Sequence, residues 1–152
     1  MVSSCSKAGR SCCTLQIALR LPTDVKARGR ITAWMFAALN SIEPHIQNLT
    51  AIDFFHAEED WAKQRRPAAL KFAQTRLAAL SNWLDGRDYL EEDRFTVADL
   101  LMTTVLRIPR HADLIAEMPT LEAYRLRCEE RPAFKKALAA QMADFSEKAS
   151  AA

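Results

Sequence analysis

The residue types that most often carry metal or nucleophilic chemistry are few and widely spaced in this sequence. The three histidines, His45, His56 and His111, have neither a metal-binding spacing nor a neighbouring nucleophile. Three of the four cysteines lie within the first 13 residues, and Cys128 stands alone in a helical segment. Adjacent cysteines with one outlier do not match a zinc-site spacing. We therefore predict no metal site, no disulfide framework and a reducing, cytoplasmic location.

A second group of candidate residues follows a helical spacing. Phe36, Asn40 and Glu43 recur at intervals of four and three residues, so one flank of a helix would present a ring, an amide and a carboxylate together. Such a flank can line a cleft that binds a small molecule, or it can be a partly solvated helix face. The residues themselves leave both interpretations open.

The elements that must position these residues are predicted to be helices only. The chain has 152 residues with 49% hydrophobic content, which suits one domain with a real core. It contains only three glycines, and no segment alternates like a strand. The net charge of +2 gives no strong field for nucleic acid or an anionic membrane. No apolar run approaches the roughly 20 residues that span a bilayer. We therefore expect neither nucleic acid nor a membrane as a partner.

Apolar periodicity and helix breakers divide the chain into segments. A first stripe runs from Ile31 to Ile42, and Pro44 should bend or end its helix. The other predicted segments are a turn or ragged helix end over 51–60, a helix over 61–84 closed by Gly86, a short helix over 119–129, and a last helix from Pro132 with Phe134, Leu138, Met142 and Phe145 facing inward.

The most specific local signal is a helix start at residues 95–100. Thr96 is predicted as the N-cap, with Asp99 completing a reciprocal capping box, and Phe95 and Leu100 occupy the positions of a hydrophobic staple. We expect the helix that follows to be central and most buried. Its predicted buried face consists of Val97, Leu100, Leu101, Thr104, Val105 and Ile108.

Several motifs in this order resemble the C-terminal domain of the glutathione S-transferase family. The Thr-x-x-Asp box after Phe95 is similar to the start of that domain's buried helix. Residues 118–124 resemble its Pro-x-Leu-x-x-aromatic helix, and residues 130–134 resemble its Arg-Pro-Ala helix start. Residues 34–44 are similar to the first long helix of bacterial members. The resemblance implies an all-α helical bundle of this C-terminal domain type.

The resemblance also implies what this chain lacks. In the family, a thioredoxin-like first domain holds glutathione and carries the residue that activates its thiol, so no residue here is expected to be catalytic and glutathione belongs to intact members. The second domain contributes a wall for a hydrophobic substrate, which would place Phe36, Asn40 and Glu43 at the cleft. Relatives dimerise partly through their first two long helices. The expected function is a transferase-like fragment without conjugating activity by itself; the alternative is a free-standing helical interaction module.

Residues 1–20 do not fit the helical domain that we predict over 21–148. They are rich in serine and cysteine and contain no acidic residue. When the third base of each codon is read with the first two of the next, residues 6–16 give Glu-Ser-Gly-Ala-Ile-Leu-Leu-His/Tyr-Ile-Ala with ordinary codons. That product resembles the family's glutathione-binding turn. We therefore expect a frame-shifted or disordered segment, and with it a truncated protein.

Overall fold

The computed structural model describes residues 22, 24–91 and 93–150, with side chains as far as Ala143. The described residues form helices and no strand, which confirms the predicted all-α fold. Residues 1–20 lie outside the described part, so the predictions made for them stay predictions. In chain order the elements are α2 (Val25–Ala37), η1 (Ala38–Ile42), α3 (Glu43–Phe55), α4 (Asp60–Leu84), α5 (Val97–Leu106), η2 (Ile108–Ala112), α6 (Pro119–Glu129) and α7 (Pro132–Ser150).

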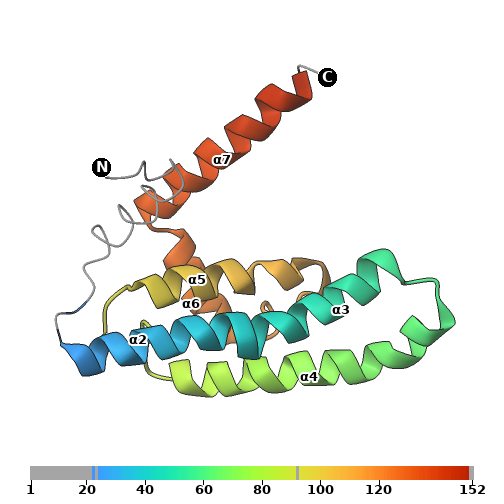
Figure 1. Cartoon of the computed structure of the whole chain (residues 1–152), viewed down its shortest axis with the longest axis horizontal. Coiled ribbons are helices and arrows are strands. Elements are labelled where there is room, and N and C mark those ends of the chain that lie inside the picture. Colours follow the sequence, from blue (N-terminus) through green and yellow to red (C-terminus); the bar gives the residue numbers. More distant parts are fainter. Residues whose placement is uncertain (1–21, 23, 92, 151–152) are drawn as a thin grey trace, which may run out of the picture.

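The first stripe forms one long rod that changes its winding before Pro44. α2 and α3 run in line (Figure 1), and the five residues of η1 between them form a π-helical turn. There the N–H of Glu43 donates to the carbonyl of Ala38, five residues back. Pro44 has no N–H, and its ring would clash with the carbonyl four residues earlier. The wider turn relieves this clash, so the rod continues to Phe55, further than the sequence predicted.

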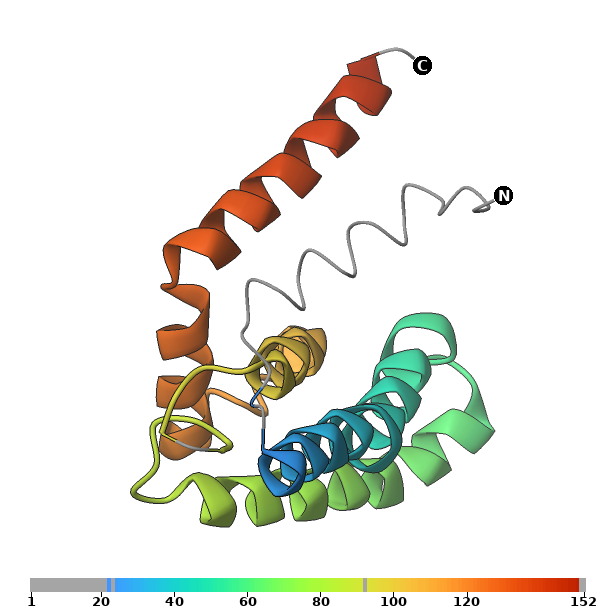
Figure 2. The same ribbon diagram turned by 60° about the vertical axis from the view of Figure 1, so that its left-hand side comes forward.

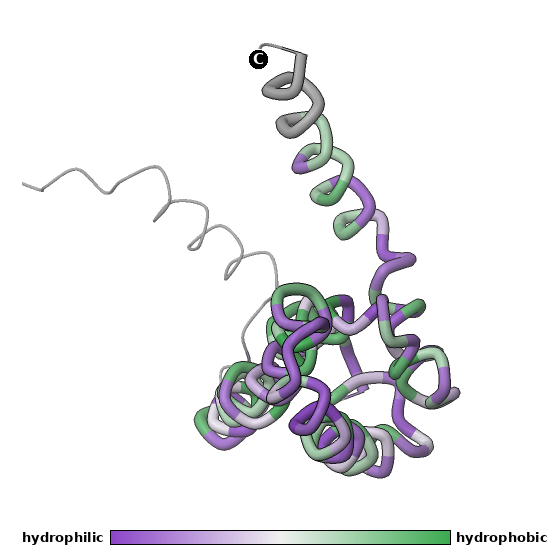
Figure 3. Tube along the Cα trace, turned by 90° about the vertical axis from the view of Figure 1, so that its right-hand side faces the viewer, coloured by the Kyte–Doolittle hydropathy of each residue, from purple (hydrophilic) through white to green (hydrophobic). Residues whose placement is uncertain are grey.

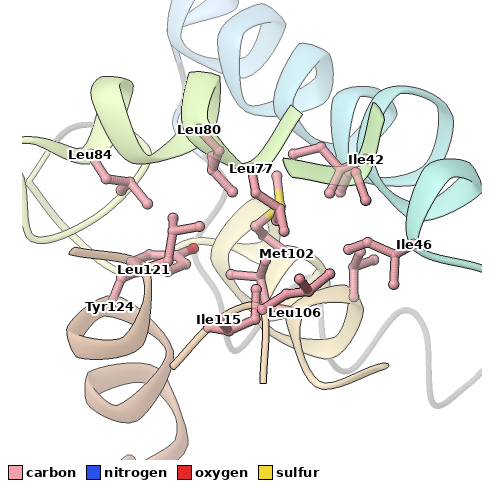
Figure 4. Close-up of a cluster of buried hydrophobic side chains, with 14 of the residues drawn as sticks. Ile42, Ile46, Leu77, Leu80, Leu84, Met102, Leu106, Ile115, Leu121 and Tyr124 are labelled. Carbon is pink, nitrogen blue, oxygen red and sulfur yellow. The ribbon is translucent and has the colours of Figure 1, made fainter. Parts of the chain in front are cut away.

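The core lies where α4 packs against the rod on one side and against α6 on the other, with α5 packed against the rod and α6. Figure 4 shows Leu77, Leu80 and Leu84 of α4 pointing toward Met102 of α5 and Leu121 of α6. All five side chains are at most 1% exposed. Burial of a leucine contributes about 1.5–3 kcal/mol, so this cluster supplies much of the stability that holds the helices in place.

α5 is apolar on two sides, and the predicted side is only partly the one inside. Val105 is buried, and Val97, Leu101 and Ile108 are partly buried and pack against the core. The residues that face inward include Ala98, Met102 and Val105, which are at most 2% exposed. Of the rest of the predicted face, Leu100 is half-buried and Thr104 is exposed. Periodicity cannot rank two apolar faces of one helix. Packing against α2, η1 and α6 decides which of them is inside.

α7 leaves the bundle instead of folding back onto it. Figure 2 shows this helix projecting away from the other helices, and its main contacts are with α6. Met142 is 57% exposed, so the predicted inward stripe is wrong for this residue. Phe134 and Leu138 are half-buried, and the Arg107 guanidinium lies 5.3 Å from the centre of the Phe134 ring. Phe145 has no described side chain. The spacing that predicts an amphipathic helix is real, but nothing in it determines where the helix points.

Candidate functional site

The three predicted substrate-wall residues lie on the outer side of the long rod. Phe36 is at the end of α2 and is 61% exposed, and Asn40 is exposed on the π-helical turn. Glu43 begins α3, is half-buried and accepts a hydrogen bond of 2.7 Å from the Gln47 amide. In the described residues, no hydrogen bond or ring contact joins the three. They therefore form a ridge, exposed at Phe36 and Asn40 and half-buried at Glu43, and their role as a wall stays a prediction.

The open side of α5 runs beside this rod. α2 and η1 both contact α5, and Leu39 of η1 is 41% exposed. Figure 3 shows hydrophobic and hydrophilic residues alternating along the helices of the bundle. An apolar surface of this kind on a small domain usually marks a place where another domain, molecule or ligand binds.

The start of α5 is held by a buried carboxylate with four hydrogen-bond donors. The capping box is present, and Asp99 Oδ2 accepts from the N–H of Thr96 at 2.7 Å and from its hydroxyl at 2.8 Å. Asp99 Oδ1 accepts from the N–H of Leu90 at 2.9 Å and from the Tyr124 hydroxyl at 3.0 Å. Asp99 is 0% exposed. Leu90 and Thr96 precede α5, Tyr124 belongs to α6, and Asp99 itself lies in α5. One side chain therefore joins three segments.

Two side chains contact the ring of Phe95, and the predicted staple with Leu100 stays a prediction. Its ring meets the ring of Tyr89 edge-on, with centroids 5.9 Å apart. The Arg131 guanidinium lies 3.9 Å from the centre of the same ring. A cation over an aromatic face is attracted by the ring quadrupole. Arg131 therefore fastens the α6–α7 junction to the start of α5.

The buried Cys128 thiol and Tyr124 phenol next to Asp99 stay protonated at neutral pH. Burial raises the pKa of the Cys128 thiol to about 11, so the thiol stays protonated at neutral pH and is a poor nucleophile. Burial, followed by the nearby Asp99 carboxylate, raises the pKa of Tyr124 far above its ordinary value. The Tyr124 hydroxyl therefore remains a donor to Asp99. Cys128 is 0% exposed, as expected for a small core residue.

A second carboxylate joins three elements at the opposite end of the bundle. Asp53 of α3 accepts from Arg66 of α4 at 2.6 and 3.1 Å. Its Oδ2 also lies 3.1 Å from Nε2 of His111 in η2. Partial burial acts to raise the pKa of Asp53, but the hydrogen bonds from Arg66 and His111 outweigh it and lower that pKa below its ordinary value. His111, which the sequence predicts as structural or solvated, thus has a structural partner.

The lowered pKa of Asp53 predicts an acid-sensitive contribution to stability. A carboxyl with a lower pKa in the folded state stabilises the fold above its unfolded pKa of about 3.9, and this stabilisation is lost as the pH falls through the folded pKa. The difference in unfolding free energy between wild type and Asp53→Asn should therefore be largest near neutral pH and shrink below about pH 4. Urea unfolding at several pH values measures it. The exposed Asp88→Asn is the control, and an equal pH trend in both variants would contradict the prediction.

The described residues offer no assembled catalytic centre. His56 lies 2.7 Å from Glu59, and His111 lies next to Asp53, but neither pair has a serine or cysteine nucleophile recorded as its partner. Within these residues no group of three histidine, cysteine, aspartate or glutamate side chains could hold a metal ion. No described helix combines the length and hydropathy needed to cross a membrane.

The comparisons with known proteins identify the family. Residues 43–132 match the family model described as "Glutathione S-transferase, C-terminal domain". The chain belongs to the glutathione S-transferase family. The matched part contains α3 to α6, including the capping box, the buried Asp99 and the partly buried Asp53. A comparison with curated proteins gave no match.

Solved structures with a similar fold are glutathione transferases. One from Burkholderia graminis, with two glutathione molecules bound per subunit, is 21% identical with a TM-score of 0.72, over 81% of this chain and 54% of its own. One from Pseudomonas fluorescens is 18% identical with a TM-score of 0.68, over 79% of this chain and 62% of its own. Glutathione transferase F7 from Populus trichocarpa is 20% identical with a TM-score of 0.64, over 86% of this chain and 66% of its own. This chain thus spans between about half and two thirds of their length.

Proposed function

We propose that this chain acts as the helical half of a glutathione transferase-like protein, supplying a substrate wall and a dimerisation surface, and that it does not conjugate glutathione by itself. The observation that carries the proposal is the second apolar side of α5, where Val97, Leu100, Leu101 and Ile108 are only half-buried. A helix with apolar residues on a second side normally buries that side as well. Covering this side requires a second body, and the matched family model describes a C-terminal domain.

The chemistry of the described side chains supports the proposal that the chain lacks conjugating activity. Rate enhancement requires a group that stabilises the thiolate more in the transition state than in the ground state. The one described thiol, Cys128, is buried and protonated, and no described histidine is paired with a nucleophile. Cysteine usage also supports our prediction of a cytoplasmic location, where thiols stay reduced.

A turnover assay with the 152-residue chain tests this proposal. With glutathione and 1-chloro-2,4-dinitrobenzene as substrates, we expect a rate equal to the uncatalysed reaction. Calorimetry should detect no glutathione binding at millimolar concentration. Saturable turnover that a single substitution abolishes would mean that the chain contains its own catalytic site, and the proposal would be wrong.

The substrate wall is tested by a matched pair of exposed phenylalanines. Phe36 and Phe55 are 61% and 79% exposed and lie at distant positions on the same rod. We expect Phe36→Ala to weaken the binding of an apolar fluorescent probe several-fold and Phe55→Ala to leave it unchanged. Equal effects of the two substitutions would show that the probe binds exposed rings without using the Phe36–Asn40 ridge.

A stacked pair of aromatic rings on α3 and α4 supports a dimerisation surface on the first two long helices. Phe72 of α4 is 62% exposed and stacks on His45 of α3, with ring centroids 5.9 Å apart. A large ring held flat on the surface of two packed helices is typical of an interface residue. Phe72→Glu should then lower the apparent molecular mass in sedimentation if the chain forms a homodimer by this surface.

One observation favours the alternative, an interaction module. Phe54, Phe55 and Trp61 gather around the α3–α4 turn and are 46–79% exposed. This aromatic group lies far along the rod from Phe36, at the other end of the α3–α4 pair (Figure 1). Binding of a partner that Phe55→Ala abolishes and Phe36→Ala does not would favour the module over the substrate wall.

A further inference from the structure

A solvent-open cavity of about 300 Å³ lies between η2 and α6, away from the ridge described above. Its buried lining is apolar and consists of Leu106, Pro109 and Ile115. Figure 4 shows Leu106 and Ile115 side by side at the lower edge of the core. Small-molecule sites in proteins begin at about this volume and combine an apolar lining with a few placed charges.

Two of the four charged residues that line the cavity are already neutralised. Arg125 Nε and Nη2 donate to the two carboxylate oxygens of Glu122 at 2.9 and 2.5 Å. Arg125 Nη1 donates to Glu129 at 2.8 Å. A bidentate pair of this geometry is strong and specific. These residues therefore form a fixed wall of the cavity.

The other two charged residues are available to a ligand. Arg110 Nη2 reaches Glu129 only at 3.3 and 3.5 Å, and the Arg110 side chain is 53% exposed. No hydrogen bond or ion pair of the Asp113 carboxylate is recorded within the described part of the chain. Asp113 has a left-handed backbone with φ of 50°, and its N–H donates to the Arg110 carbonyl at 3.4 Å. One turn of chain thus holds one positive and one negative side chain at the same cavity.

We propose that this cavity binds a small zwitterion with an aliphatic body, of the α-amino acid class. The ligand's carboxylate pairs with Arg110, which exchanges its long contact to Glu129 for a shorter one, and the ligand's ammonium group pairs with Asp113. The two groups sit on one carbon of the ligand, which suits partners three residues apart on a single turn. The aliphatic side chain then covers Leu106, Pro109 and Ile115. A dianion or a dication would leave one of the two rim charges unpaired in a site closed by the ligand.

The test is a titration of the ¹⁵N-labelled full chain with L-leucine, followed by NMR. We expect saturable shifts confined to the amides of residues 110–116 and 122–125. Leucinamide lacks the carboxylate and N-acetyl-leucine lacks the ammonium group. Each should bind about tenfold more weakly or worse, because each loses one charge-assisted hydrogen bond.

Paired variants assign each end of the ligand. Asp113→Asn removes the negative charge but keeps the shape of the side chain, and asparagine also tolerates the left-handed backbone. Arg110→Gln removes the positive charge. Each should weaken leucine binding about tenfold, and Arg110→Gln should not weaken leucinamide further. Asp88→Asn and Arg127→Gln are controls with the same charge changes. Arg127 of α6 and Asp88 of the loop after α4 form an exposed ion pair elsewhere on the surface.

Two results would overturn the proposal. One is the absence of saturable shifts with leucine at tens of millimolar. The other is binding that Arg110→Gln and Asp113→Asn leave unchanged in variants whose spectra show the native fold. Because the assay uses no glutathione and no electrophile, its outcome is independent of the transferase-like function proposed above.

Discussion

Replacing Asp99 by alanine should destabilise the domain by about 3–5 kcal/mol, more than the loss of a helix cap alone, which costs about 0.5–2 kcal/mol. The carboxylate accepts from four donors, and those of Leu90, Thr96 and Tyr124 would remain buried after the substitution. Each buried donor left without an acceptor costs about 1–3 kcal/mol. Because a domain of this size has a total stability of about 5–15 kcal/mol, the variant should be close to unfolding. Urea denaturation followed by circular dichroism measures the change.

Two further variants show whether the effect comes from the network. Thr96→Ala removes only part of the box, and the double variant with Asp99→Ala should cost less than the sum because the two residues share bonds. Asp88→Asn alters a 69% exposed carboxyl and should change stability by less than about 0.5 kcal/mol. Strict additivity of the Thr96 and Asp99 substitutions would show that they do not act as one reciprocal unit.

Val105→Glu should prevent stable folding, whereas Leu101→Glu should leave a folded domain. Val105 is 2% exposed and faces the core, so a glutamate there would be a buried charge without a partner. Such a change belongs to the small class that costs more than about 4 kcal/mol. Leu101 is half-buried and packs against the core from the more open side of α5, where a carboxylate can still reach water. Thermal unfolding of the two variants makes the comparison.

The Val105→Glu and Leu101→Glu variants also test whether the open side of α5 binds a second body. If that side meets a second body, as proposed, Leu101→Glu should reduce self-association or binding there without a large loss of melting temperature. An unfolded Leu101→Glu together with a stable Val105→Glu would mean that the inner and outer faces of α5 are the reverse of those described.

Much of the fold was predictable because it depends on local chemistry. The helices over 61–84 and 119–129 have, within one residue, the bounds that their apolar spacing and breakers predict. Pro44 predicts a change in the first helix because a missing N–H is a property of one residue. The Thr96–Asp99 box predicts the start of α5 because all its bonds lie within four residues. The family resemblance rested on the same local motifs, and the family match confirms it.

The candidate site was less predictable, because its residues depend on partners far away in the sequence. The π-helical turn at η1 places Asn40, and periodicity at 100° per residue does not anticipate it. Nothing local pairs Asp53 with His111, which is 58 residues away. The one signal in the sequence for such pairs is a polar residue next to a buried helix. This signal does not identify the residue with which it pairs.

By itself, the sequence determined the helical class, most helix ends, the capping box and the family, since each of these rests on contacts within one or two turns of chain. Tertiary structure alone decided which of the two apolar sides of α5 is inside, where α7 points, and that Asp99 also binds Leu90 and Tyr124. The physical reason is that hydrophobic burial has no direction of its own. Two equally apolar faces become different only when other helices pack against one of them.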